Sequence, residues 1–201
     1  MKYKNNQDDY IFTKMIDDED MNMRIVNRIA DAGDEVYQVT NVKADVTMGN
    51  YHTLYPEFRK LADIVEDFCK ESTIEMNMDF ENHHYRINLP QWRSVAVESL
   101  KVNMMCGIRY TSGEVCLPHN HWPAQWAFTY YIDPPEGCSN LVFPTIGTEI
   151  EVEHGKLVVF QGSTIHETIA KQFEGERFTV SGTVTFAGAN YEPTIFSGGQ
   201  R

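Results

Sequence analysis

From about residue 95 onward, the chain consists of short apolar segments separated by glycine and proline. Eight of these segments have the character of strands: "AVESLKVN", "GIRY", "EVCLPH", "QWAFTYYI", "NLVF", "EIEVE", "KLVVF" and "RFTVSGTVTF". Turn signals such as "TSG", "DPPEG" and "EHG" lie between them. Many short strands without intervening helices predict a β-sandwich or barrel and disfavour an alternating β-α-β sheet.

The last of these segments, residues 177–186, has the most regular pattern. Apolar residues and one glycine alternate strictly with a polar set: Arg177, Thr179, Ser181, Thr183 and Thr185. Because successive side chains of a strand point to opposite faces, one face is apolar and the other is polar. The apolar face can accept a helix, and the polar face meets either water or a wet interior.

Two amphipathic helices are predicted in the first third of the chain. In residues 18–32 the apolar Met21, Ile25 and Ile29 recur every four positions, and Gly33 follows as a stop signal. A second helix can begin at Pro56. Its apolar residues fall on one face: Phe58, Leu61, Ala62, Val65, Phe68 and Cys69.

A chain of 201 residues is long enough for one domain with a sizeable core. We therefore expect a single domain over 1–201, with a helical and mixed front at 1–94, a β-barrel core at 95–187 and a C-terminal tail at 188–201. The apolar runs are too short to cross a bilayer, and the first ten residues do not resemble a secretion signal.

The formal net charge of −12 repels phosphate backbones and anionic membranes. We therefore expect neither nucleic acid nor a membrane as a partner. The expected location is the cytoplasm. Four cysteines without a CxxC pair are expected to remain reduced thiols: Cys69, Cys106, Cys116 and Cys138.

The stretch "CLPHNHWPAQW" contains two histidines, His119 and His121, separated by one residue. In a strand this spacing places both imidazoles on the same face, where they can bind one metal ion. A third ligand must come from another segment. His166 follows a glycine-started apolar strand and a short turn, which can bring it back beside an antiparallel neighbour. Imidazole nitrogen suits iron, copper, nickel and zinc, and three ligands leave positions open.

Arg177 opens the alternating strand, and the hydroxyl of Thr179 lies on the same face. A guanidinium that points into a barrel can bind a carboxylate through two hydrogen bonds, and the hydroxyl can add a third. This pair is therefore a candidate carboxylate clamp.

The ordered set His119-x-His121, "GKLVVFQGSTIH" ending at His166, and Arg177 with Thr179 resembles the 2-oxoglutarate- and iron(II)-dependent oxygenases. The segments "VNMMCGIRYTSGEVCLPHNHWPAQWAFTYYI" and "NVKADVTMGNYHTLYPEFRKLADIVEDF" are similar to uncharacterised bacterial and phage oxygenases of that superfamily. The likeness covers roughly residues 40–186.

This resemblance implies a mainly β fold, the double-stranded β-helix or jelly-roll barrel, with N-terminal helices against it. It implies iron(II) bound by His119, His121 and His166, and 2-oxoglutarate whose distal carboxylate binds Arg177 with help from Thr179. Tyr110, on the preceding strand, lies where related enzymes offer a phenol to the cosubstrate. The implied activity is a dioxygenase that oxidises, by hydroxylation, an unidentified small-molecule or peptide substrate and releases succinate and CO2. If the gene belongs to a phage, the expected location is the host cytoplasm.

One ligand position departs from the family pattern, because His121 stands where His-x-Asp or His-x-Glu is usual. Two alternatives therefore stay open. The stretch "GEVCLPHNHWPAQ" also fits a cupin-like metal enzyme that does not use 2-oxoglutarate, although Gln125 replaces the expected glutamate. A non-catalytic jelly-roll binding module is the other.

Four aromatic residues near the histidine pair can either line the site or pack in the core. Trp122 and Trp126 flank the pair, and packing is the more common role of such residues in a β-rich core. Tyr130 and Tyr131 are adjacent on the following strand, so at most one of them can face the site.

Overall fold

The strand with the alternating pattern separates an apolar layer from a polar one. The computed structural model describes residues 2–4, 10–32, 41–83 and 98–187. In strand β12 (Arg177–Phe186), Val180 and Val184 belong to the large apolar cluster that includes the helices. On the opposite face, Arg177 and Thr179 are only 2% and 1% exposed. The polar face of this strand is therefore an interior face.

Within the described residues the strands form two antiparallel sheets. The larger has seven strands in the order β1 (Lys2–Lys4), β2 (Tyr10–Met15), β10 (Lys156–Gln161), β7 (Trp126–Tyr131), β12, β5 (Leu100–Tyr110) and β4 (Asp45–Val46). The smaller has five in the order β3 (Val42–Lys43), β6 (Val115–His119), β11 (His166–Thr168), β8 (Leu141–Phe143) and β9 (Thr148–Ile150).

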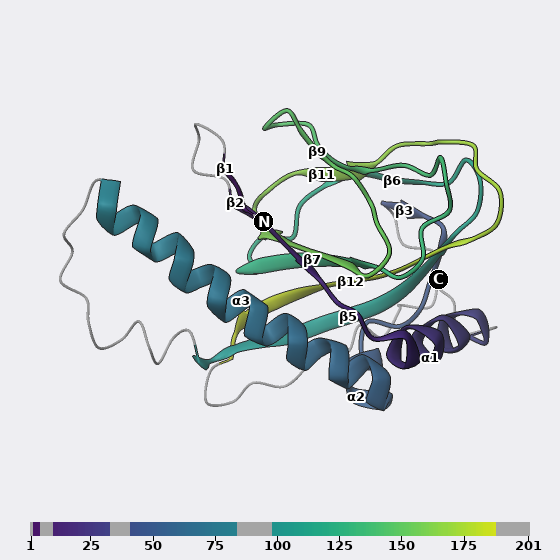
Figure 1. Ribbon diagram of the computed structural model, residues 1–201, viewed down its shortest axis with the longest axis horizontal. Helices are drawn as coiled ribbons and strands as arrows, with labels where there is room; N and C mark the ends of the chain where they lie inside the picture. The colour runs from purple at the N-terminus through teal and green to yellow at the C-terminus, as the bar shows by residue number, and fades with distance from the viewer. Residues whose placement is uncertain (1, 5–9, 33–40, 84–97, 188–201) are drawn as a thin grey trace, which may run out of the picture.

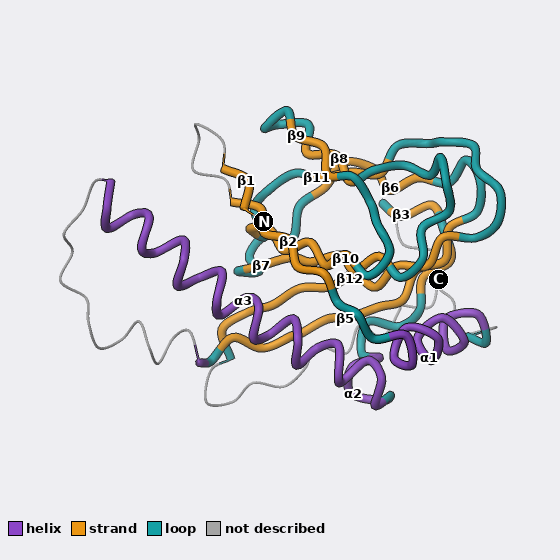
Figure 2. Tube along the Cα trace, viewed as in Figure 1, coloured by secondary structure: helices purple, strands orange, loops and turns teal. Residues whose placement is uncertain are grey.

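The two sheets lie face to face, and the helices cover the outer side of the larger one (Figure 1). Two apolar clusters fill the space between the sheets. One contains Tyr131 and Phe160 from the larger sheet and Phe143 from the smaller, and the other contains Tyr110 and Cys116. The strand and loop paths in Figure 2 show the same two layers. This arrangement is the jelly-roll, or double-stranded β-helix, predicted from the sequence.

Helix α1 (Glu19–Ala30) confirms the first predicted helix. Asp18 caps it, because its carboxylate accepts a hydrogen bond from the amide of Met21 at 3.1 Å. Its apolar residues Ile25 and Ile29 are buried. The predicted stop at Gly33 lies outside the described residues.

Helix α3 (Pro56–His83) confirms the second predicted helix, and the short α2 (Tyr51–Leu54) precedes it. The predicted apolar face is buried against the larger sheet, with Phe68 partly buried. Glu66, which is buried, also fixes α3 to β5: it accepts hydrogen bonds from Lys101 Nζ at 2.8 Å and from the amide of Val102 at 3.1 Å.

Strand β5 corrects one prediction. The segments "AVESLKVN" and "GIRY" were expected as two strands separated by residues 104–106, but residues 100–110 form one continuous strand. A Cβ at Gly107 would lie 2.3 Å from Cγ1 of Ile29 in α1. The glycine therefore gives room for the helix and does not end the strand.

Four strands of the described chain, β1 to β4, lie before residue 95 and were not identified in the sequence analysis. β1, β2 and β4 extend the larger sheet, and β3 extends the smaller one. The front of the chain thus contributes strands to both sheets. The division into front, barrel and tail remains a prediction, and the tail at 188–201 lies outside the described residues.

All four cysteines are buried as free thiols. Among the described residues, none of the helices is both long and apolar enough to span a membrane.

Candidate metal and cosubstrate site

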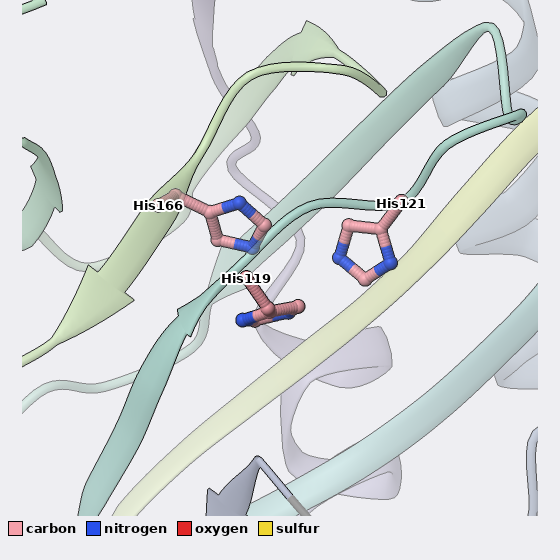
Figure 3. A group of neighbouring side chains, drawn as sticks. All are labelled: His119, His121 and His166. Atoms are coloured by element: carbon pink, nitrogen blue, oxygen red, sulfur yellow. The ribbon is translucent and has the colours of Figure 1, made fainter. Parts of the chain in front are cut away.

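Three imidazoles meet between the two sheets. His119 ends β6, His166 begins β11, and the two are register partners in the antiparallel pair. His121 lies two residues beyond His119. One ligand nitrogen from each ring lies within 4.8 Å of the other two, and the rings turn a nitrogen toward a common point (Figure 3). The described chain thus brings together the three histidines that the sequence analysis selected, in a group that could hold a metal ion.

A β-bulge sets the direction of His119. Between the two register pairs, β11 advances two residues, from His166 to Thr168, while β6 spans three, from Cys116 to His119. The extra residue in β6 places Cys116 and His119 on the same side of the strand, where regular alternation would separate them. Accordingly, Sγ of Cys116 lies 3.6 Å from Nδ1 of His119.

Backbone carbonyls determine which imidazole nitrogen can bind a metal. Nδ1 of His119 lies 2.9 Å from the carbonyl oxygen of Leu117, and Nδ1 of His166 lies 3.2 Å from that of Thr164. A carbonyl only accepts hydrogen bonds, so each Nδ1 carries the proton and donates it. The lone pair of each ring is then on Nε2, which is the arrangement expected of a metal ligand.

The three imidazoles are held in the neutral state that metal binding requires. Burial lowers the pKa of His166 well below its ordinary value, and the neighbouring His119 and His121 lower it further. Burial also lowers the pKa of His121 to about 4, and it lowers that of His119. At neutral pH the site therefore presents lone pairs and carries no competing protons.

Arg177 is enclosed in the same interior. Its guanidinium carbon lies 5.1 Å from the ring centre of Tyr110 and 5.0 Å from that of Tyr131. Nη1 donates a hydrogen bond to the carbonyl oxygen of Ser139 at 2.9 Å. Nε of Arg177 is buried and has no hydrogen-bond partner. A buried donor without an acceptor is costly, so this atom fits an anionic ligand.

The other two predicted cosubstrate residues lie beside Arg177. Tyr110 is its register partner on β5, and Thr179 lies two residues along β12, on the same face. Burial raises the pKa of Tyr110 well above its ordinary value, and it raises the pKa of Tyr131 to about 12. Both phenols therefore keep their protons at neutral pH and can donate a hydrogen bond to a carboxylate.

Cys116 connects the histidine group to the arginine. Its thiol contacts His119, and the positive charge of Arg177 acts on the same thiol, opposing the burial that raises its pKa to about 11. Ser139 lies beside the arginine, where its carbonyl oxygen accepts the hydrogen bond from Nη1. Its hydroxyl accepts a second hydrogen bond, from the amide of Ile169 at 3.2 Å. Cys116 is thus a neighbour of both the histidine group and the arginine between the two sheets.

Sequence reasoning missed Cys116 and Ser139 as neighbours of the site. Strict alternation would place Cys116 opposite His119, and a bulge of this kind has no signature in one sequence. Ser139 acts through its backbone carbonyl, so its side chain gives no signal. Tyr131 was one of two alternatives. The structure selects it, because Tyr130 is on the outer face and donates its hydroxyl to Asn22 at 2.6 Å.

The two tryptophans have different environments. Trp126 is 1% exposed and packs in the core, where its indole N–H donates to Thr73 Oγ1 at 2.9 Å. Trp122 is 75% exposed. The packing role expected for both is confirmed for Trp126 and wrong for Trp122, which lies on a turn that leaves the sheet.

No protein-family model and no curated protein sequence matches the chain. Solved structures do. The viral collagen prolyl hydroxylase of Paramecium bursaria Chlorella virus-1, in complex with 2-oxoglutarate, matches with a TM-score of 0.56 and 14% identity over 88% of this chain and 97% of the other. A Pseudomonas putida prolyl-4-hydroxylase matches with a TM-score of 0.58 and 12% identity over 89% and 93%.

A third structure carries the family name itself. It is an oxidoreductase of the 2OG-Fe(II) oxygenase family from Burkholderia pseudomallei, with a TM-score of 0.52 and 14% identity over 89% of this chain and 86% of that one. The chain has the 2-oxoglutarate/Fe(II) oxygenase fold. At these identities the likeness establishes the fold, and the chemistry has to be argued from the residues of this chain.

Within the oxygenase fold, the group of three is made of imidazoles alone. The His121 position, where the resemblance leads one to expect a carboxylate, presents a ring that is half-buried and neutral. A metal ion bound here would keep its full charge of +2 until an anion joins it. An anionic cosubstrate would therefore supply the charge that the missing carboxylate would otherwise contribute.

Proposed function

We propose that this protein is an iron(II)- and 2-oxoglutarate-dependent dioxygenase that oxidises, by hydroxylation, an organic substrate and releases succinate and CO2. The observation that carries the proposal is the shared interior of three neutral imidazoles and one buried guanidinium with an unpartnered Nε. The oxygenase fold supports it, since neighbours with this fold are named as prolyl hydroxylases, one of them in complex with 2-oxoglutarate.

The three histidines fit a first-row divalent ion. Nε2 of His119 and of His166 would bind it, because both Nδ1 atoms are engaged with carbonyl oxygens. Three nitrogen ligands on one side leave positions for a bidentate cosubstrate and for oxygen. Iron(II) with 2-oxoglutarate supplies, when bound, the activation of O2 that transfers one oxygen atom to a substrate C–H bond.

The residues around Arg177 fit the distal carboxylate of 2-oxoglutarate. The guanidinium would bind it through Nε and the remaining N–H groups, while Ser139 holds Nη1 in place. The hydroxyls of Thr179 and Tyr110 would add hydrogen bonds. The two flanking phenol rings exclude water from the guanidinium, which strengthens the charge pair.

The experiment is a melting-temperature series under argon with three additions: Fe(II) alone, 2-oxoglutarate alone, and both together. A ligand that binds only the folded protein raises the melting temperature. We expect Fe(II) to stabilise the wild type, and the two ligands together to stabilise it further by several degrees. Arg177→Ala should keep the increase caused by iron and lose the additional increase caused by 2-oxoglutarate.

Arg24→Ala is the matched control, because Arg24 is an exposed arginine on α1 that pairs with Asp20 across one helical turn. It should behave like the wild type. Iron binding with equal 2-oxoglutarate shifts in wild type and Arg177→Ala would favour the cupin-like alternative. A protein that binds neither iron, nickel nor zinc would favour a non-catalytic binding module.

A further inference from the structure

We propose that Asn103 determines the specificity of the site by binding an uncharged amide group of the primary substrate. The inference rests on the proposed function, because it concerns the molecule that this site would oxidise. A β-bulge turns the side chain of Asn103 into the interior between the sheets, beside the histidine group and at a distance from Arg177.

Asn103 is the extra residue of this bulge in β5. β12 advances one residue, from Thr183 to Val184, while β5 passes over Asn103 and spans two. Val184 belongs to the apolar cluster on the helix side, so Thr183 beside it faces the interior. Oδ1 of Asn103 accepts a hydrogen bond from the hydroxyl of Thr183 at 2.8 Å. The bulge therefore brings Asn103 to the interior face of the larger sheet.

Hydrogen bonds connect this part of β12 to the turn that carries His121. The carbonyl oxygen of Val184 accepts from the amide of Gln125 at 3.0 Å. The carbonyl oxygen of Gln125 accepts from the amide of Gly162 at 3.1 Å, and that of Gly162 accepts from the amide of His121 at 2.7 Å. Figure 3 shows β12 running past the histidine group. Asn103 thus lies on the His121 side of the site.

The register of the larger sheet gives the same placement. The ring centre of Phe160 lies 4.5 Å from that of His166. Phe160 pairs with Ala127 on β7, and Ala127 pairs with Thr183 on β12. Two strand spacings, about 10 Å, therefore separate Thr183 from the residue that contacts His166. A molecule of a few linked groups that binds at Thr183 and Asn103 would reach the histidines.

The pair Asn103–Thr183 is too far from Arg177 to hold the same end of the cosubstrate. Six residues of one strand, about 20 Å, separate Arg177 from Thr183. An arginine side chain and a five-carbon dicarboxylate laid end to end are shorter than this. Arg177 is 2% exposed, whereas Asn103 is half-buried, and so are His119 and His121. Solvent therefore reaches the polar interior at the level of Asn103 and the histidines.

The hydrogen bond within the pair determines what it can bind. Thr183 uses its hydroxyl proton on Oδ1 of Asn103, so its oxygen is left to accept from a ligand. Nδ2 of Asn103 keeps two N–H donors. A donor and an acceptor side by side match the C=O and the N–H of an amide group.

The three strands around the pair bring no charge to it. On β5, Lys101 pairs with Glu66 of α3, and Arg109 pairs with Asp45 of β4. β7 contains no charged residue, and β12 contains only Arg177. A charged substrate group would therefore lose hydration here without gaining a counter-ion from these strands. An uncharged amide exchanges its hydrogen bonds to water for those of the pair.

The test uses 15N-labelled protein loaded with Zn(II) and 2-oxoglutarate, in which no turnover occurs, and follows the side-chain NH2 resonances of Asn103 by NMR. Three pools contain the same uncharged amino acids with different end groups: N-acetyl amides (neutral), N-acetyl acids (anionic) and amides with a free amine (cationic). At pH 7 we expect the neutral pool to shift the Asn103 resonances saturably, at a concentration at least fivefold lower than either charged pool.

Asn103→Ser assigns the resonances and removes the two N–H donors. Followed through the signals of the ligands, it should bind the neutral pool at least fivefold more weakly. Its affinities for Zn(II) and for 2-oxoglutarate should stay within twofold of the wild type. This combination separates recognition of the substrate from a loss of folding and from a role in cosubstrate binding.

Asn103→Asp keeps the acceptor for Thr183 and replaces the NH2 group by a carboxylate oxygen. It should bind the neutral pool at least fivefold more weakly and the cationic pool at least fivefold more tightly than the wild type does. Asn27→Asp, which adds the same charge at an exposed position of α1, is the matched control and should bind all three pools like the wild type.

The inference is overturned if no pool shifts the Asn103 resonances up to its solubility limit, if the charged pools bind as tightly as the neutral one, or if Asn103→Asp leaves the preference unchanged. If Zn(II) and 2-oxoglutarate fail to stabilise the wild type before any pool is added, the proposed function fails, and the inference fails with it. Stabilisation by both ligands without binding of the neutral pool overturns the inference alone.

Discussion

At the scale of single residues, the ordered spacing of His119, His121 and His166 was sufficient to predict that these three side chains would meet. They meet because His119 and His166 lie at the ends of two short strands that pair with each other, and His121 follows two residues later. Cys116 could not be predicted, since its place beside His119 depends on one extra residue in β6. The roles of these residues in binding iron and 2-oxoglutarate remain predictions.

The first prediction concerns the ligand that departs from the family pattern. His121→Asp should bind Fe(II) at least as tightly as the wild type, because a carboxylate adds charge neutralisation to the site. His121→Ala should bind it at least tenfold more weakly, and His154→Ala, an exposed histidine outside the group, should match the wild type. Anaerobic calorimetry with Fe(II) measures all four proteins. Equal affinities of His121→Ala and the wild type would show that His121 is not a ligand.

At the scale of secondary-structure elements, the sequence predicted α1, α3 and most barrel strands from their periodicity. It failed at β5 because the segments on either side of residues 104–106 were treated as separate strands, although Gly107 continues the strand and gives room for Ile29. The two-residue strands β3 and β4 are too short to show a period. Such strands form because a longer strand beside them provides hydrogen-bond partners, and the residues of that strand are distant in the sequence.

The second prediction concerns the turn that carries His121. The amide of His121 donates a hydrogen bond to the carbonyl oxygen of Gly162. Gly162→Ala would place a methyl group 2.1 Å from the carbonyl oxygen of Ala124, so the turn must shift. We expect a loss of stability of roughly 1–3 kcal/mol, typical of overpacking, and weaker metal binding. Gly49→Ala is the control, because its new Cβ meets only the flexible side chain of Met104. Urea unfolding and metal titration measure both effects. If Gly162→Ala binds metal as tightly as the wild type does, the turn does not position His121.

The third prediction concerns the attachment of α3 to β5. Glu66 has a side chain that is 3% exposed, and it accepts from Arg59, Lys101 and the amide of Val102. Glu66→Ala removes the acceptor that these three donors share and should lower the free energy of unfolding by roughly 2–3 kcal/mol. The loss should be somewhat smaller than for a fully buried pair, because the two cations are partly exposed. Metal affinity should not change, since the helix lies outside the barrel.

Asp63→Ala removes the other carboxylate that pairs with Arg59, but this one is exposed. It should cost less than about 1 kcal/mol. If the two variants were equally stable in urea, the burial of Glu66 would not explain how much its ion pairs contribute to stability.

At the scale of the whole molecule, buried histidines couple folding to pH. Burial, followed by the charge of Arg59, lowers the pKa of His52 from 6.5 to about 4, and the three site imidazoles shift in the same direction. Above pH 6.5 these rings are neutral in both the folded and the unfolded chain. As the pH falls below 6.5, the unfolded chain takes up protons first, so stability declines toward pH 4.

The fourth prediction follows from this sign. In chelator-treated protein, the urea midpoint should fall between pH 7 and pH 5, and the fall should be smaller in His52→Gln. Parallel curves for the wild type and His52→Gln would show that His52 does not contribute to the acid sensitivity.

The central claim is that one interior binds a metal ion and a dicarboxylate together. A crystal structure of the protein with Mn(II) and 2-oxoglutarate, with anomalous data to locate the metal, tests it most directly. The account predicts one metal peak within about 2.0–2.2 Å of a nitrogen from each of His119, His121 and His166. It also predicts a carboxylate of 2-oxoglutarate at hydrogen-bond distance from Nε of Arg177. A metal bound elsewhere, or an Arg177 without the carboxylate while the metal site is filled, would contradict it.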